Sequence, residues 1–261
     1  MDPLGTNRVY VNNIIQSYQP FAQGISCVTI GNSYVAAAKS QRGSLNTDDV
    51  ALYCNWTKIK DPYNNSFAWI SNVGSIGKKY AMMNDVYDAL SPAGTDEDNH
   101  GGILNDWEYI ETEEDYSDTD LTELDEAQIN PIIIDEVWGT MIYGDKTLQV
   151  ELNDTSFVGH RRLYKYLIKQ ITRNILRKQE FKNNDRLHRL KAKSTTEAFL
   201  EIVNADEIIN FYIVQCDEKN NNAAVLAARK FILDLYIQIT PNSQRVLLRL
   251  TRLPQVNVAA E

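Results

Sequence analysis

The longest regular pattern in the chain lies in residues 158–181, where apolar side chains recur about every four residues. The stripe consists of Leu163, Leu167, Ile171 and Ile175, widened by Ile168 and Leu176. Because this spacing places side chains on one face of an α-helix, it predicts an amphipathic helix, and basic residues fill the opposite face. Further helices are expected over Gly74–Leu90, Tyr116–Ala127 and Thr195–Val203.

Runs of branched and aromatic residues elsewhere favour strands or extended segments. The strand-like and short apolar runs are Ile25–Ile30, Val50–Lys60, Phe67–Ile70, Ile129–Ile134, Val137–Tyr143, Ile208–Cys216, Phe231–Thr240 and Arg245–Leu253. The last two runs flank the turn Pro241-Asn242-Ser243, so we expect them to form an antiparallel hairpin. The whole pattern predicts an α+β fold, with mixed or antiparallel sheets packed against helices.

Charge is distributed unevenly along the chain, whose formal net charge is −9. Between Asp96 and Glu136 there are sixteen acidic residues and no Lys or Arg. Between Arg161 and Lys193 there are twelve basic residues, against only Glu180 and Asp185. The acidic block is typical of a solvated loop and the basic block of a solvated helix face. In a self-assembling protein the two blocks could instead meet across subunits and set their register.

The sequence offers little catalytic chemistry. None of its three histidines (His100, His160 and His188) stands in a zinc-ligand spacing, and Asp96-Glu97-Asp98 lacks the spacing of a calcium loop. Only two residues separate the glycines of Gly74-Ser75-Ile76-Gly77-Lys78-Lys79, so the segment is not a phosphate-binding P-loop. We expect no cofactor and no metal, and we expect that the chain is not an enzyme. A small metal-dependent hydrolase using His100 remains the alternative from another class.

The composition also argues against nucleic acid and membranes as partners. The sequence pI is about 4.9, and no aromatic-interleaved motif accompanies the basic helix, so nucleic acid is not expected as a partner. No long apolar run or signal-peptide pattern is present, so we expect no membrane contact and folding in a cytosol. The three cysteines (Cys27, Cys54 and Cys216) lie far apart in apolar stretches and are expected to be buried thiols.

Several segments resemble the tail sheath proteins of contractile phages. They are Phe67-Ala68-Trp69-Ile70, Gly74-Ser75-Ile76-Gly77, Asp85, Ser91-Pro92-Ala93-Gly94, Gly102-Ile103-Leu104-Asn105, Ile129-Asn130-Pro131-Ile132, Tyr143-Gly144-Asp145-Lys146-Thr147-Leu148, Val158-Gly159-His160-Arg161-Arg162-Leu163 and Phe211–Asp217. Their order and spacing over residues 45–253 carry the resemblance. The chain departs from the family at Ser71-Asn72-Val73 and in its short N-terminal part, as expected for a small sheath, a split subunit or a fragment.

The resemblance implies a domain organisation. Residues 1–24 would be an N-terminal arm or lead-in, and residues 25–150 a partial α/β domain with an acidic insertion at 95–127. Residues 151–253 would be the C-terminal sheath domain, and residues 254–261 a C-terminal arm. Sheath subunits form a helical sleeve around an inner tube and contract to drive tube penetration and genome ejection. Terminal arms add strands to sheets of neighbouring copies, so residues 208–253 would be the receiving platform.

The same resemblance implies the partners and the contact residues. The partners would be further copies of the chain in a helical sheath, the inner tail tube protein, and the baseplate and tail terminator. The location would be the virion tail, assembled in the host bacterial cytoplasm. A sheath initiator, or a type VI secretion or pyocin-like sheath, is the nearest alternative. The candidate interface residues are Arg162, Lys165, Lys169, Arg173, Arg245, Leu247, Arg249, Thr251, Pro254, Gln255, Val256, Asn257 and Val258.

Overall fold

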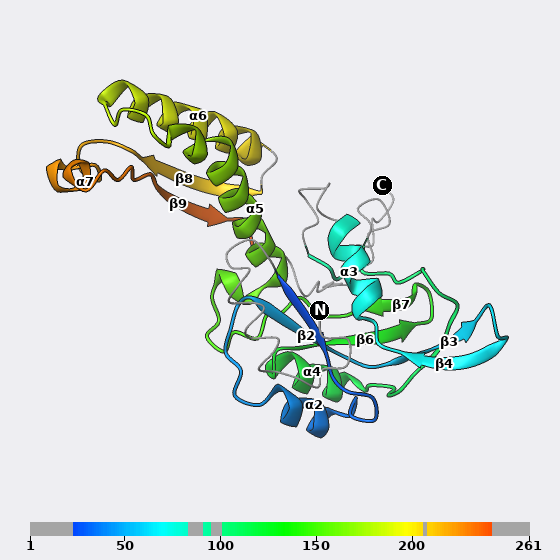
Figure 1. The fold of residues 1–261 in the computed structure, drawn as a ribbon. Helices are drawn as coiled ribbons and strands as arrows, with labels where there is room; N and C mark the ends of the chain where they lie inside the picture. Colours follow the sequence, from blue (N-terminus) through cyan, green and yellow to red (C-terminus); the bar gives the residue numbers. More distant parts are fainter. Residues whose placement is uncertain (1–22, 83–90, 95–100, 206–207, 242–261) are drawn as a thin grey trace, which may run out of the picture.

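The computed structural model describes residues 23–82, 91–94, 101–205 and 208–241. In chain order the elements are β1 Gly24–Cys27, α2 Val35–Arg42, β2 Val50–Cys54, β3 Thr57–Asp61, β4 Ser66–Ile70, α3 Val73–Met82, β5 Tyr109–Thr112, α4 Asp118–Glu126, β6 Ile129–Asp135, β7 Gly139–Ile142, the 3-10 turn η2 Asp154–Ser156, α5 Val158–Asn174, the 3-10 turn η3 Leu176–Gln179, α6 Arg186–Ala205, β8 Ile209–Gln215, α7 Ala223–Ala227 and β9 Asp234–Ile239. Figure 1 shows two groups of elements joined by α5. We call the described residues of 23–157 the N-terminal unit and those of 158–241 the C-terminal unit.

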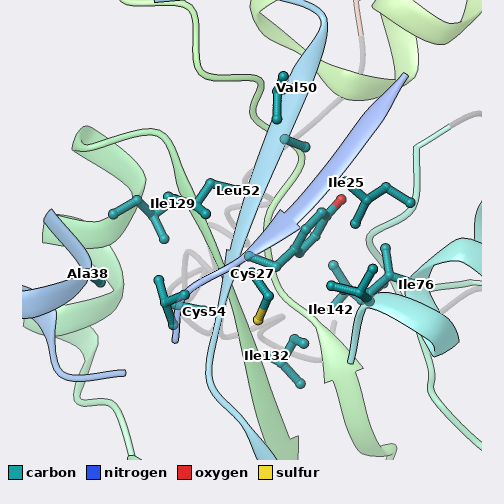
Figure 2. Close-up of a cluster of buried hydrophobic side chains, with 14 of the residues drawn as sticks. Ile25, Cys27, Ala38, Val50, Leu52, Cys54, Ile76, Ile129, Ile132 and Ile142 are labelled. Atoms are coloured by element: carbon teal, nitrogen blue, oxygen red, sulfur yellow. The ribbon is translucent and has the colours of Figure 1, made fainter. Parts of the chain in front are cut away.

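The N-terminal unit is built on a four-stranded sheet in the order β1-β2-β6-β7. Strands β1, β2 and β6 run parallel, whereas β7 pairs antiparallel with β6. All five residues of β2 are buried, as expected for a central strand covered on both faces. Figure 2 shows Leu52 and Cys54 of β2 among apolar side chains from β1, α2, α3 and β6. The predicted α+β class is confirmed.

One predicted strand is in fact two strands in different sheets. The run Val50–Lys60 divides into β2 and β3, and β3 is the middle strand of a second sheet in the order β4-β3-β5. The break occurs at Asn55, whose φ of 84° lies in the left-handed region that Asn adopts more readily than most residues. The Asn55 side chain donates to the carbonyls of Glu114 (2.8 Å) and Ile132 (2.9 Å), which holds the chain as it changes sheets.

Two of the segments that resemble sheath motifs contact each other beside α5. The Asn130 side chain accepts a hydrogen bond from Lys146 N (2.7 Å) and donates to Lys146 O (2.7 Å). A Cβ on Gly144 would lie 2.9 Å from Asn130 Cα, so only glycine permits this close approach. Leu148 N then donates to Val50 O on the central strand (2.9 Å). These contacts fix the segment that leads into α5.

The C-terminal unit has its own hydrophobic cores, formed by α5, α6 and the two-stranded sheet of β8 and β9. The larger core contains Leu163, Leu167, Leu200, Val203, Ile209, Val214 and Ile239. The predicted stripe on α5 therefore points inward, since Leu163, Leu167, Ile171 and Ile175 are all buried. Strands β8 and β9 pair antiparallel, from Ile209 opposite Ile239 to Gln215 opposite Asp234.

Several predicted boundaries were wrong. The long helix ends at Asn174 and continues as η3, while α6 begins nine residues before the predicted Thr195. Helix α7 was not expected, although its N-cap Asn222 accepts hydrogen bonds from Ala224 N and Val225 N. Part of the predicted helix Gly74–Leu90 and the predicted hairpin strand Arg245–Leu253 lie outside the described residues. Within those residues, β9 pairs with β8.

Candidate assembly surfaces

Helix α5 is attached to the N-terminal unit by a buried cluster of charges. Asp49, directly before β2, accepts from Lys165 Nζ (2.7 Å) and from Arg161 Nη2 (2.8 Å). Both Asp49 and Lys165 are buried. Burial lowers the pKa of Lys165, and the Asp49 carboxylate opposes this shift. Arg161 is therefore part of a structural ion pair at the start of α5.

Arg162 enters a second buried polar site one step around the same helix. Its guanidinium donates to Tyr80 O (2.5 Å) and lies over the Tyr80 ring, 4.6 Å from the centroid. The Tyr80 hydroxyl lies 2.7 Å from that of Tyr53 on β2. The Asp145 side chain, from the segment that precedes α5, accepts a hydrogen bond from Gly159 N in the first turn of α5 (3.2 Å). Burial raises the pKa of Asp145 to about 7.

These two sites correct the prediction that the whole basic face of α5 is solvated. Arg162 and Lys165 were expected on an outward-facing surface, but both are buried and hold α5 against the N-terminal unit. The physical reason is that the first turns of α5 are covered on both sides, by the C-terminal core and by the N-terminal unit. Lys169 is half-buried and Arg173 is exposed, so the exposed basic surface begins only further along the helix.

Sequence reasoning missed Asp49 as the residue that holds α5. The structure places Asp49 at the entry to the central strand, where its side chain is buried. Two adjacent carboxylates immediately before a fully apolar strand were the available signal. A buried carboxylate requires a charged or hydrogen-bonding partner, and the basic start of the amphipathic helix supplies it.

Among the described residues, the sheet of β8 and β9 is covered on one face only. Helix α6 lies on the covered face, where the Tyr212 hydroxyl donates to Glu201 Oε2 (2.6 Å). On the other face Phe211 is 56% exposed, Ile213 48% and Tyr236 57%. Within the described residues each strand has one neighbour, so both outer edges of this sheet offer unpaired backbone groups. An open apolar face with free edges is a surface that a further strand can complete.

The remaining candidate residues cannot be placed on this surface. Outside the described residues lie Arg245, Leu247, Arg249, Thr251 and the segment Pro254–Val258, as do residues 1–22 of the predicted N-terminal arm. The described chain ends at Pro241, directly after β9.

The described part of the acidic block is more ordered than expected. It contains β5, α4 and β6. Glu113 accepts hydrogen bonds from Gly31 N and from the Ser33 hydroxyl, and Asp125 pairs with Lys146 (2.8 Å). Several carboxylates of this block are thus structural, whereas those on the outer side of α4 are exposed.

The described residues hold no group of three or more His, Cys, Asp or Glu side chains suited to a metal ion. His100 and Asp96-Glu97-Asp98, on which a hydrolase would depend, lie outside them. Gly74 and Gly77 lie within α3 and do not form a loop before it. His160 and His188 contact Asp154 O (3.2 Å) and Asp185 Oδ1 (2.9 Å), and the latter is an exposed contact. No helix in the described ranges combines the length and apolarity needed to cross a bilayer.

Comparison with known proteins supports the resemblance seen in the motifs. The chain is 27% identical over 186 residues to the tail sheath protein of Vibrio phage KVP40, covering 70% of this chain and 26% of that protein. It is 30% identical over 180 residues to the tail sheath protein of Enterobacteria phage T4, covering 68% of this chain and 26% of the relative. The chain thus spans about a quarter of the length of these relatives. No protein-family model matches it.

The fold is also found among solved sheath structures. The sheath complex of an extracellular contractile injection system (PVC), solved in its contracted state, matches with a TM-score of 0.73 and 17% sequence identity. The match covers 92% of this chain and 67% of that chain. At this identity the match shows the fold alone, and it extends over both units.

Proposed function

We infer that this chain is a structural subunit, or the assembly core of one, of a contractile phage tail sheath. The observation that carries this inference is the agreement between sequence and fold. The sequence relatives are tail sheath proteins, and the similar fold covers 92% of this chain. The chain spans 26% of each sequence relative, so the activity of a whole sheath subunit is part of the proposal.

The β8–β9 sheet provides a physical means of linking copies. A strand from another copy can pair with a free edge, because main-chain donors and acceptors are satisfied there without a specific side-chain match. The exposed Phe211, Ile213 and Tyr236 would be covered by the side chains of the added strands. We assign residues 1–20 and Pro254–Glu261 as the donated arms. A link of this kind lets copies change orientation without separating.

The other partners follow from the same role. Copies would form a helical sleeve around the inner tail tube, with Lys169 and Arg173 as tube-facing or subunit-facing candidates, and the sleeve would end at the baseplate and the tail terminator. Contraction would drive tube penetration and genome ejection. The location would be the virion tail after assembly in the host bacterial cytoplasm. The proposal needs no catalytic step, cofactor or metal.

Electron microscopy of the purified chain tests the proposal. We expect open-ended tubes or sheath-like polymers that grow with protein concentration. Deleting Pro254–Glu261 should abolish them while the far-ultraviolet circular dichroism spectrum stays that of the parent. Unchanged tubes after the deletion would refute the arm assignment. A strictly monomeric chain with metal-dependent hydrolytic turnover would refute the sheath role and favour the hydrolase.

A further inference from the structure

The two units carry opposite charge. The described residues of the N-terminal unit contain nineteen acidic and seven basic side chains. Those of the C-terminal unit contain fifteen basic and seven acidic side chains. Such a division disfavours contacts between like units and favours contacts between unlike ones, so it is a candidate determinant of how copies orient.

The basic charges gather at the end of the C-terminal unit that lies away from the N-terminal unit. We define the basic end as Arg173, Arg177, Lys178, Lys182 and Arg186, at the end of α5, in and after η3, and at the start of α6. All five are exposed, and within the described part of the chain none of them forms an ion pair. Charges left unpaired in one chain remain available to a partner.

An apolar side chain lies in the middle of the basic end. Phe181 is fully exposed, and its φ of 62° is a left-handed conformation that few phenylalanines adopt. It is flanked by Glu180 and Lys182. Exposed aromatic side chains surrounded by charged residues are typical anchors of protein interfaces, because the aromatic ring supplies buried area and the charges supply orientation.

The complementary surface is the outer side of α4 in the N-terminal unit. We define the acidic face as Asp115, just before α4, together with Asp118, Glu123 and Glu126 on α4, which are all exposed. Of these four, only Glu123 forms an ion pair with another described residue, the partly exposed Lys39 at 2.6 Å. The acidic face is thus neutralised much less than the inner carboxylates of the same unit.

The two surfaces lie at opposite ends of the molecule. Figure 1 places α4 at the lower side of the N-terminal unit and the start of α6 at the far upper end of the C-terminal unit. Within one chain they cannot meet. Complementary patches on different ends of the same molecule produce head-to-tail contacts, which generate open helical polymers when they do not close into a ring.

We propose that the basic end of one copy docks onto the acidic face of a neighbouring copy. This inference rests on the proposed sheath role and deepens it. Strand exchange at β8–β9 would join the copies without fixing their relative orientation, whereas the charged contact sets which end of one copy meets which end of the next. Because the docking contact is ionic and exposed to solvent, added salt weakens it, whereas salt does not weaken the main-chain hydrogen bonds between exchanged strands in this way.

Charge reversal with reciprocal rescue tests the docking. The variant R173E/R177E reverses the basic end, D118K/E126K reverses the acidic face, and a third chain carries all four changes. Each two-site variant should raise the critical concentration for polymer formation about tenfold at low salt, measured by sedimentation and electron microscopy. The four-site chain should return to near the parent value, because its two surfaces are complementary again. The control K60E/K78E makes the same charge change as R173E/R177E, at exposed positions of the N-terminal unit outside both surfaces, and should assemble like the parent.

The outcomes separate this inference from the proposed function. For the parent chain, raising NaCl from about 0.05 M to about 1 M, where the Debye length is about 3 Å, should also weaken assembly. Polymers that form equally well with both surfaces reversed would overturn the docking and leave the sheath role standing. A basic-end variant that the acidic-face changes do not rescue would assign the basic end to another partner, such as the inner tube, and overturn the docking. A parent chain that never assembles would contradict the sheath role itself.

Discussion

In the part of the chain that the structure describes, the N-terminal unit encloses its main sheet, whereas the C-terminal unit leaves one face of its sheet uncovered. Strand β2 is buried at every position, with neighbours on both edges. Strands β8 and β9 have one neighbour each within the described residues, and three large side chains on one face are about half exposed. A two-stranded sheet is marginal alone in water, and here α6 supports only one side of it. The difference indicates which unit is complete and which one awaits a partner.

The joint between the units contains buried charges. Asp49 holds Arg161 and Lys165, and Arg162 reaches Tyr80. A buried charge that loses its partner costs much more than an exposed one, so this joint has a strict geometry. We expect the two units to keep one relative arrangement because α5 starts inside the first unit and forms the core of the second.

The largest expected effect is at the joint. Asp49→Ala leaves Lys165 buried without this carboxylate and should lower the free energy of unfolding by about 3–5 kcal/mol. Chemical denaturation at neutral pH measures the loss. The control Lys39→Ala removes one partner of the exposed pair with Glu123 and should cost no more than about 1 kcal/mol. Equal losses of unfolding free energy for the two variants would show that the buried charges at the joint stabilise the chain no more than an exposed ion pair does.

The next largest effect is the loss of stability caused by a substitution in the hydrophobic core of one unit. All four tryptophans, at positions 56, 69, 107 and 138, lie in the N-terminal unit, so tryptophan fluorescence reports that unit alone. Leu200→Ala in the C-terminal core should cost about 2–5 kcal/mol. This loss should shift the circular dichroism transition more than the fluorescence transition.

The matched variant for this comparison is Leu148→Ala in the N-terminal core, where Leu148 is also fully buried. It should shift the fluorescence transition at least as much as the circular dichroism transition. Coincident shifts by both probes for both variants would mean that the chain unfolds as one cooperative unit, contrary to the contrast between the units.

A smaller effect is the pH dependence of stability that comes from Asp145, in the buried polar site next to the start of α5. Burial raises the pKa of Asp145 to about 7, against about 3.9 in an unfolded chain. The folded state therefore holds this proton more tightly, and the contribution of Asp145 to stability is full below about pH 4 and is lost as the pH rises through about 7. Asp145→Asn should flatten this part of the profile and stabilise the chain at pH 8 by on the order of 2 kcal/mol. An unchanged slope between pH 4 and 8 would contradict the assignment.

The fold could be predicted where local pattern and packing agree. The spacing of Leu163, Leu167 and Ile171 gave the inner face of α5, and the branched runs at 129–134 and 208–216 gave β6 and β8. The break at Asn55 could not be predicted, because alternation continues across it and only tertiary hydrogen bonds reveal the turn.

The candidate surface was predictable only in part. Helical periodicity placed Arg162 and Lys165 opposite the apolar stripe, but it could not show that a second unit covers that side as well. The long-range pairing of Lys165 with Asp49 spans more than a hundred residues and leaves no local pattern in the sequence. The exposed apolar face of β8 and β9 likewise depends on what covers the strands, which sequence alternation alone does not determine.

Hydrogen–deuterium exchange on β8 and β9 tests the central claim most directly, when the dispersed chain is compared with its polymer. A strand added by another copy would pair the outer-edge amides, so their exchange should slow at least tenfold in the polymer, while exchange in the central strand β2 stays as it was in the dispersed chain. Equal exchange of β8 and β9 amides in both states would contradict the claim that a neighbouring copy completes this sheet.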